Sequence, residues 1–439
     1  MSSQTTHDEQ LALAALDPGR LIADLAALVR EPSVTGAERE VVELVAALGH
    51  GFGLEAEVVE HDLAALRAHP DAPGEEAPRV ELLHADVILR GADAGAPRLC
   101  LNGHVDVVFE GTVPWVHGPW SGAVVDGALH GRGAVDMKAG VVAALHAMAA
   151  VRAAGIELEG DVVLQAVPSE EDGGLGTFAA LERDSAFAAA LIPEPTGFRL
   201  VCAQAGALTF AGTVTGVAAH AAVRLEGISA IDRYLPIHQA LAAHERTVNA
   251  DVAHELMRAH ALAYPLLVGR VQAGRWSSQV PDELRFEGRL GVPIGADPAD
   301  ARADLQAVVD AAVGDGAPVA LEWSGGQFAP AETDAGHPWV GQVRDAAAAE
   351  LGTAPPLAGV TWGADMRLFA ARGIPCVMLG THGLELAHAV DERVRIAEVE
   401  QLARILVRTI LAWGAARRSA VAVQGERQPP RAARRGPAG

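Results

Sequence analysis

The stretch DVVLQAVPSEEDGGLGT, residues 161–177, carries an apolar strand-like segment directly into three consecutive acids, Glu170, Glu171 and Asp172. Three like charges at the end of a strand repel one another unless a cation or a proton lies among them. The pattern therefore indicates a metal site or an acid/base site. A solvated turn is the alternative, because acids and glycines are common in loops.

Outward from this stretch, strands and helices alternate along the chain. Apolar runs predict strands at residues 55–61, 85–90 and 97–104, and the run at 141–155 predicts a buried helix. Strands that alternate with helices are typical of an α/β sheet with both faces covered. We therefore expect an α/β domain in which the three acids follow one of the strands.

The first fifty residues have apolar side chains at helical spacing. This pattern, from Leu11 to Gly51, predicts two helices separated by EPSVTGAERE, residues 31–40. Ser33 or Thr35 is expected to cap the second helix, since a hydroxyl there accepts a hydrogen bond from the first helical turn.

A different pattern begins near residue 206. The order there is strand, helix, strand, strand, helix and strand, which predicts helices on a compact antiparallel sheet inserted between two parts of the larger domain. The last residues are rich in Arg, Pro and Ala without periodicity, which is typical of a disordered basic tail. The expected division is a catalytic domain at 1–205 and 328–416, an inserted domain at 206–327 and a tail at 417–439.

Composition narrows the class of protein. The chain has 439 residues, 50% of them hydrophobic, which is enough for two packed domains. Its formal net charge of -22 disfavours nucleic acid and anionic membranes as partners. The polar N-terminus and the absence of a long apolar run predict neither an export signal nor a membrane span, so we expect a cytoplasmic protein.

The three cysteines and the single lysine give two further expectations. Cys100, Cys202 and Cys376 are odd in number, far apart and in apolar surroundings, so they predict buried thiols and no disulfide framework. Lys138 is the only lysine in the chain, and it stands in GRGAVDMKAG. Chance survival and a specific interaction that holds this lysine are both open explanations.

His104 and Asp106 end an apolar strand in RLCLNGHVDVV. Positions i and i+2 of a strand face the same side, so the imidazole and the carboxylate can meet. A carboxylate in this position orients a metal-binding histidine. A polar loop histidine is the alternative interpretation.

Three more polar residues lie beside apolar elements of the same domain. Asp136 precedes the helix at 141–155, Glu194 stands between two prolines, and His388 lies in GLELAHAVDERV. Each alone is also compatible with a helix cap, a turn or a surface position. With His104 and Glu171 they make a set of five imidazole and carboxylate ligands, which suits zinc, cobalt or manganese better than calcium.

Six segments, in this order, carry a resemblance to a known family: NGHVDVV, GRGAVDMKAG, PSEEDGGLGT, PEPTG, GVAAHAA and AHAVDE. They resemble the zinc-dependent amidohydrolases and exopeptidases that include acetylornithine deacetylase, succinyl-diaminopimelate desuccinylase, aminoacylase and carboxypeptidase G. The likeness extends from about residue 15 to 415. It implies a zinc-exopeptidase-like α/β catalytic domain with an inserted ferredoxin-like α+β domain that acts as a lid and in dimerisation.

The resemblance also implies roles for the polar residues. His104 and Glu194 would bind one Zn²⁺, Glu171 and His388 a second, and Asp136 would bridge both, with Co²⁺ or Mn²⁺ as possible substitutes. Asp106 would orient His104. Glu170 would be the general base, and Asp172 only an acid at a helix start.

Two residues of the inserted domain are implied by the same likeness. His220, in GVAAHAA, would donate a hydrogen bond to the developing oxyanion in the site of a partner subunit, which implies a homodimer. Arg289, in RFEGRLGVP, would bind a substrate carboxylate, although a surface arginine on a strand is an equal alternative.

Two segments depart from the family pattern. Relatives often have asparagine where this chain has Ser278, and Gly-Pro-Gly where it has Gly380, Thr381 and His382. His382 either enters the pocket or stays on a surface loop. These departures leave the metal ligands intact but put the familiar substrates in doubt.

The sequence thus predicts a dinuclear zinc hydrolase that cleaves the amide bond of a small N-acyl amino acid or related amine. A dipeptidase or carboxypeptidase of the same family is the first alternative. A metal-binding protein without catalysis is disfavoured, because all five ligands and Glu170 are present.

Overall fold

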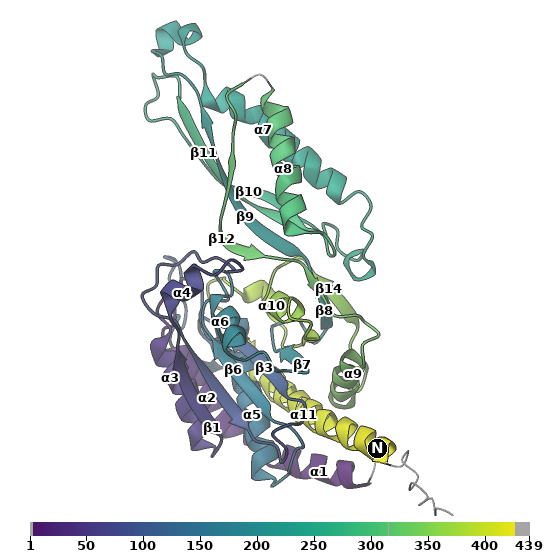
Figure 1. Cartoon of the computed structure of the whole chain (residues 1–439). Helices are drawn as coiled ribbons and strands as arrows, with labels where there is room; N and C mark the ends of the chain where they lie inside the picture. The colour runs from purple at the N-terminus through teal and green to yellow at the C-terminus, as the bar shows by residue number, and fades with distance from the viewer. Residues whose placement is uncertain (1–2, 315, 426–439) are drawn as a thin grey trace, which may run out of the picture.

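A computed structural model describes residues 3–314 and 316–425. Figure 1 shows a large lobe and an elongated small lobe, which is built from the segment that begins with β9 (Gly206–Thr215) and ends with β12 (Leu321–Phe328). The chain leaves the large lobe once and returns to it, so the small lobe is an insertion.

A nine-stranded mixed sheet forms the centre of the large lobe, in the order β1-β2-β6-β3-β7-β15-β8-β13, with β14 beside β8. β3 lies between β6 and β7 and is parallel to both. The strands are β1 (Glu55–Glu60), β2 (Leu83–Leu89), β3 (Leu99–His104), β6 (Val162–Val167), β7 (Ala189–Ile192), β8 (Leu200–Gln204), β13 (Ala331–Glu332), β14 (Leu357–Val360) and β15 (Cys376–Met378).

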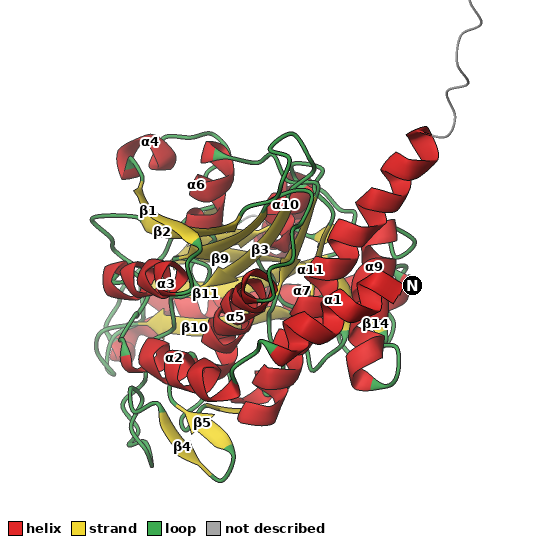
Figure 2. Ribbon diagram, turned by 90° about the horizontal axis from the view of Figure 1, so that it is seen from below, coloured by secondary structure: helices red, strands yellow, loops and turns green. Residues whose placement is uncertain are grey.

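Helices cover both faces of this sheet, as the alternating pattern predicts. Along β6, Val162 and Leu164 belong to one hydrophobic cluster and Val163 to another, because successive side chains of a strand point to opposite faces. Figure 2 shows α2, α3, α5 and α11 gathered over one face. The helices of the large lobe are α1 (Ser3–Ala14), α2 (Pro18–Arg30), α3 (Arg39–Gly51), α4 (Leu63–Arg67), α5 (Ala139–Ala153), α6 (Leu175–Arg183), α9 (Pro338–Leu351), α10 (Met366–Ala370) and α11 (Ile396–Gly425).

The prediction of two helices before residue 52 is wrong, since three are present. Asp17 divides the first apolar stretch: its carboxylate accepts a hydrogen bond from the backbone N–H of Arg20, and Pro18 begins α2. The predicted caps of α3 are also wrong. Ser33 and Thr35 instead donate their hydroxyls to Val105 and Asp106, and α3 begins without a side-chain cap.

The small lobe has the strand order β10-β11-β9-β12, with every pair antiparallel. Helices α7 and α8 contribute to a single hydrophobic cluster with these strands. This is the ferredoxin-like order that the sequence predicts. The elements are β9 (Gly206–Thr215), α7 (Ala230–Val248), β10 (Leu266–Ala273), β11 (Glu283–Val292), α8 (Pro298–Val313) and β12 (Leu321–Phe328).

Several short elements complete the structure. A three-stranded sheet has the order β16-β5-β4. Its strands are β4 (Ala123–Val125), β5 (Ala128–His130) and β16 (Arg393–Arg395), and the short helical turns are η1 (Ala134–Lys138), η2 (Ala221–Glu226), η3 (Glu255–Met257) and η4 (Leu384–Leu386).

The C-terminal helix corrects one more expectation. α11 runs to Gly425, so the segment predicted as a disordered tail from residue 417 begins as helix. Alanine and arginine are good helix formers, which allows the helix to continue beyond the packed core. Residues 426–439 lie outside the described residues.

One described segment, Ala134–Ala153, is long and apolar enough to cross a membrane, but 94% of its apolar window is buried in the fold. It contains α5, which packs against α11, and it is a core helix. The three cysteines are buried and free, as predicted.

Lys138 has a specific buried partner. Its Nζ donates hydrogen bonds to the carbonyl oxygens of Leu28 (2.8 Å) and Glu31 (3.0 Å) at the end of α2. The last carbonyls of a helix lack partners within the helix, and here the lysine supplies one. Complete burial lowers the pKa of this amine to about 7.

Candidate active site

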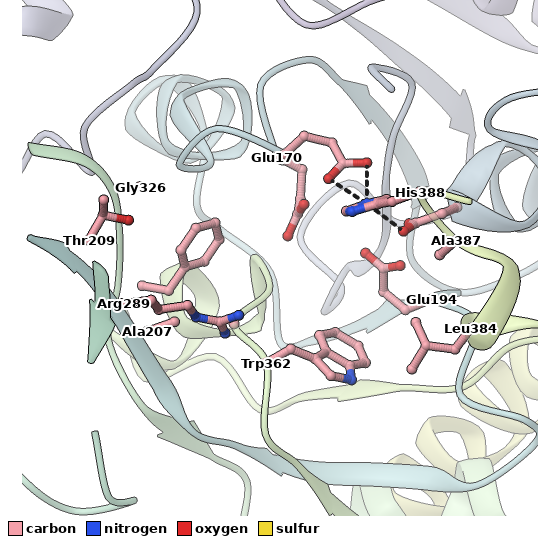
Figure 3. A pocket seen from close by; sticks show the side chains of 14 residues that line it. Glu170, Glu194, Ala207, Thr209, Arg289, Gly326, Trp362, Leu384, Ala387 and His388 are labelled. Atoms are coloured by element: carbon pink, nitrogen blue, oxygen red, sulfur yellow. Dashed lines mark hydrogen bonds and ion pairs between the residues drawn. The ribbon is translucent and has the colours of Figure 1, made fainter. Parts of the chain in front are cut away.

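A cavity of about 370 Å³ lies between the two lobes (Figure 3). Large-lobe residues contribute acids, His388 and Trp362, while the small lobe contributes Arg289 from β11 and Phe328 from β12. The lining residues are Asp136, Glu170, Glu171, Glu194, Ala207, Thr209, Arg289, Gly326, Phe328, Trp362, Gly363, Leu384, Ala387 and His388.

The sheet topology brings the predicted ligands together. His104 ends β3, the acids of the quoted stretch follow β6, and Glu194 follows β7. These three strands are parallel neighbours, so their carboxyl ends meet at one edge of the sheet. Open α/β sheets commonly bind ligands at this edge.

The predicted ligands form two groups that share one carboxylate. His104, Asp136 and Glu194 make the first group, and Asp136, Glu171 and His388 make the second, with the ligand atoms of each group within 4.8 Å of one another. Nε2 of His104 lies 3.1 Å from Oδ1 of Asp136, and Nε2 of His388 lies 3.4 Å from its Oδ2. The two oxygens of Asp136 therefore face different groups, as a bridging ligand requires.

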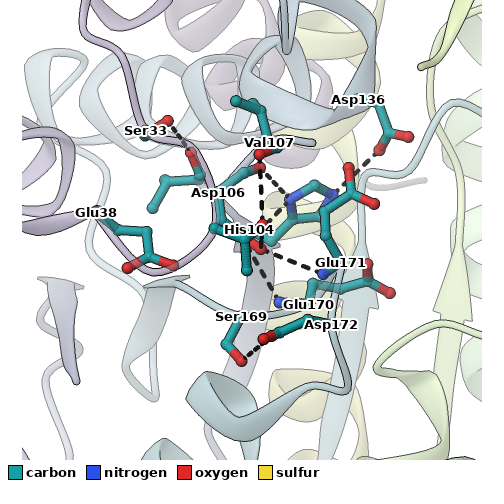
Figure 4. A network of polar contacts seen from close by, with 12 residues as sticks. Ser33, Glu38, His104, Asp106, Val107, Asp136, Ser169, Glu170, Glu171 and Asp172 are labelled. Carbon is teal, nitrogen blue, oxygen red and sulfur yellow. Dashed lines mark hydrogen bonds and ion pairs between the residues drawn. The ribbon is translucent and has the colours of Figure 1, made fainter. Parts of the chain in front are cut away.

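Asp106 organises the first group through two contacts (Figure 4). Nδ1 of His104 donates to the backbone oxygen of Asp106 at 2.9 Å and lies 3.5 Å from its carboxylate. Because a carbonyl oxygen only accepts, Nδ1 carries a proton, and Nε2 is the nitrogen that faces Asp136 and Glu194 and can bind a metal. The carboxylate of Asp106 also accepts the backbone N–H groups of Glu170 and Glu171, both at 3.2 Å, and so holds the acidic turn in place.

Glu170 lines the cavity beside these groups but belongs to neither. Burial raises the pKa of its carboxyl well above the usual value, and repulsion from Asp365, Glu194 and Glu171 raises it further. A group of this kind is placed to accept and return a proton.

The donor set fits divalent cations. Burial raises the pKa of Glu171 and Glu194 as well, and the negative charge of Asp136 adds to this effect in both. Such crowding of carboxylates is relieved by positive charge between them. Mixed nitrogen and oxygen ligands in groups of three are typical of hydrolytic metal centres with an open position.

Asp172 is not the helix-start acid that the sequence predicts. α6 begins at Leu175, whereas the buried carboxylate of Asp172 accepts a hydrogen bond from the guanidinium of Arg79 at 3.0 Å. Arg79 also lies 3.3 Å from Glu38. This buried cluster holds the acidic turn in place. The sequence did not indicate it, because no local pattern surrounds Arg79.

A second missed device joins the loops that carry Asp136 and His388. Arg132 and Glu392 form a buried ion pair with a distance of 2.8 Å between Nη1 and Oε2. Arg132 also donates to the backbone oxygen of His388 at 3.4 Å, and Glu392 accepts the N–H groups of Val135 (2.9 Å) and Asp136 (3.3 Å). Arg132 lies in the motif GRGAVDMKAG and Glu392 in AHAVDE, and this was the only indication in the sequence that they belong to the site.

Glu392→Gln is expected to lower the free energy of unfolding of the metal-free protein by about 3–5 kcal/mol, because Arg132 would stay buried without its counter-ion. It should also reduce the metal content of the group containing His388. Urea denaturation and metal analysis measure the two effects.

Glu322→Gln is the matched control, since Glu322 pairs with Arg285 at an exposed site. Its expected cost is below about 1 kcal/mol. Equal losses in the two variants would contradict the role assigned to the Arg132–Glu392 pair.

The remaining predicted residues lie in different places. Arg289 lines the cavity, together with Trp362 and Phe328, which the sequence did not single out. His220 is exposed on the small lobe and does not line it. His382 is exposed on a loop and lines a separate hollow, so the surface-loop alternative describes this chain.

Comparison with known proteins agrees with this geometry. Residues 100–412 match the model of peptidase family M20/M25/M40. A succinyl-diaminopimelate desuccinylase from Methylobacterium nodulans is 31% identical over 403 residues, covering 88% of this chain and 94% of that protein.

Solved structures share the fold. The dipeptidase Dug1p from Saccharomyces cerevisiae superposes with a TM-score of 0.72 at 15% identity, covering 94% of this chain and 99% of that one. A dinuclear metal-binding M20 peptidase from Bacillus subtilis gives a TM-score of 0.62 at 18% identity, with coverage of 91% and 98%. Taken with the shared carboxylate and the family match over most of the chain, these findings establish that the protein belongs to peptidase family M20/M25/M40, whose members are metal-dependent enzymes acting on amide bonds.

Proposed function

We propose that this hydrolase cleaves the amide bond of a small N-acylated amino acid or related amine. The observation that carries the proposal is the sharing of Asp136 by two ligand groups beside the unligated acid Glu170. Two divalent ions, proposed to be zinc, supply Lewis-acid polarisation of the amide carbonyl and acidify the attacking water. Glu170 accepts the proton of that water and returns it to the departing amine.

Arg289 is the proposed partner of a substrate carboxylate. It projects from β11 into the cavity and has no hydrogen bond or ion pair to any described residue. A guanidinium pairs well with a carboxylate through parallel N–H donors. This supports an N-acyl amino acid over an amine that lacks a carboxylate.

A homodimer formed through the small lobe is part of the proposal. Exposed apolar side chains gather near His220 and on helix α7, and exposed apolar clusters of this kind commonly mark protein interfaces. They include Val217 (47% exposed), Leu225 (90%), Ile231 (42%), Leu235 (52%) and Trp276 (72%). On this proposal, His220 of each subunit completes the site of the other. We also place the protein in the cytoplasm, where its three free cysteines would remain reduced.

The experiment that tests the proposal measures primary-amine release from N-formyl, N-acetyl and N-succinyl amino acids and from dipeptides, using protein reloaded with zinc or cobalt after chelation. Release from acyl substrates only with metal is the expected result. Release from dipeptides alone would show that the protein is a dipeptidase and not a deacylase. No amine release from any of these compounds, with metal bound, would contradict the proposal.

A further inference from the structure

The charges that line the cavity are unequal. Four carboxylates, those of Asp136, Glu170, Glu171 and Glu194, face it, and Arg289 is the single arginine or lysine among the described lining residues. When two divalent cations are bound, their charge balances the four carboxylates, and the guanidinium of Arg289 is left as one uncompensated positive charge. The cavity is therefore balanced by a ligand with one negative charge.

No other described arginine is placed to receive a second carboxylate. Arg367 lies behind Phe328, with its guanidinium carbon 4.2 Å from the ring centroid, and it is 4% exposed. Its N–H groups already bind backbone oxygens of Gly173 and Ala364 and face Asp365. Arg289, in contrast, is an exposed side chain at the wall of the cavity, and it has no ion pair with a described residue.

Apolar side chains form much of the rest of the wall. Trp362, Phe328, Leu384, Ala207 and Ala387 line the same cavity, and Figure 3 shows the Trp362 indole beneath Glu194, between Arg289 and Leu384 in that view. Aromatic and aliphatic surfaces of this kind favour apolar groups of the ligand. The volume of about 370 Å³ is near the lower end of ordinary ligand pockets, so the substrate is small.

We infer that the site selects N-acyl amino acids that carry one carboxylate in total and an apolar acyl group or side chain, and that it discriminates against substrates with a second carboxylate, such as N-succinyl compounds. The inference rests on the proposed function and specifies its substrate class. Arg289 holds the carboxylate, Trp362 and Phe328 contact the apolar group, and a second carboxylate would face the acids without a cation of its own.

Matched substrates isolate the second charge. N-butanoyl-leucine and N-succinyl-leucine have acyl chains of equal length and differ by one terminal carboxylate; N-acetyl-methionine and N-acetyl-glutamate make the same comparison in the side chain. The member of each pair with a single carboxylate is expected to have about 100-fold higher kcat/KM. Calorimetric binding to the metal-loaded Glu170→Gln variant measures recognition without turnover; because this variant has one negative charge fewer in the cavity, it is expected to keep the preference with a smaller ratio in Kd.

Two variants assign the effect to residues. Arg289→Met should abolish the preference for N-acetyl-leucine over N-acetyl-leucinamide, whereas Arg285→Met, on the same strand but outside the cavity, should leave it unchanged. Trp362→Ala should raise KM for N-acetyl-phenylalanine about tenfold and leave N-acetyl-glycine nearly unaffected, because only the larger side chain reaches the indole.

The outcomes separate this inference from the proposed function. Cleavage of N-succinyl-leucine equal to or faster than that of N-butanoyl-leucine would overturn the one-carboxylate inference and leave the deacylase intact. Absence of cleavage of every acyl substrate would overturn the proposed function itself. Unchanged carboxylate preference in Arg289→Met would remove the role of that residue.

Discussion

Glu170→Gln is expected to lower kcat by about 10²–10⁴-fold while the metal content stays that of the wild type. Glu170 lines the cavity but belongs to neither ligand group, and the amide keeps its size and its backbone contact with Asp106. What the variant loses is the ability to accept a proton. Steady-state kinetics on an accepted acyl substrate and metal analysis of the same preparation measure the two quantities.

Its neighbour supplies the matched control. Glu171→Gln changes the adjacent residue in the same manner, but Glu171 belongs to the group with Asp136 and His388, so this variant should lose metal. The expected contrast is therefore an inactive, metal-replete protein against an inactive, metal-poor one. Retained turnover in Glu170→Gln, or metal loss equal to that of Glu171→Gln, would contradict the assignment of Glu170 as base.

The sequence indicated that the candidate ligands would lie together, although each alone is a weak signal. His104 is the last residue of β3, and Glu171 and Glu194 stand in the segments that follow β6 and β7; parallel strands bring such ends together. The buried ion pairs that hold these residues in place could not be predicted in this way. Arg132 and Glu392 are 260 residues apart, and Arg79 and Asp172 are 93 apart, so their pairing depends on the tertiary fold.

The errors at the N-terminus have a local cause. Asp17 followed by Pro18 is a start signal for a helix, but apolar periodicity continued across it and concealed the break between α1 and α2. The hydroxyls of Ser33 and Thr35 also fit a cap by sequence, yet they serve the turn at Asp106. A residue near the site can satisfy a local pattern and still have a distant partner.

His220→Ala is expected to lower kcat by about 10²–10³-fold, although His220 lies outside the cavity of its own subunit. Nδ1 of His220 accepts the backbone N–H of Ala222 at 3.1 Å, which leaves the proton on Nε2 as a donor facing outward. If a partner subunit receives this donor, the loss is catalytic. Ser229→Ala is the control, because it removes the side-chain cap of α7 in the same lobe. If His220 only caps the turn η2, His220→Ala should lower activity no more than Ser229→Ala does.

Mixing two inactive variants distinguishes donation across the dimer from donation within one chain. A heterodimer of His220→Ala and Glu170→Gln subunits contains one site in which the intact Glu170 of the first subunit meets the intact His220 of the second. Random reassociation of equal amounts should restore about one quarter of wild-type activity, because half of the dimers are mixed and each has one complete site. Donation within a chain predicts no recovery, since every subunit then lacks one of the two groups. Recovery thus requires both that the enzyme is a dimer and that each small lobe serves the site of its partner.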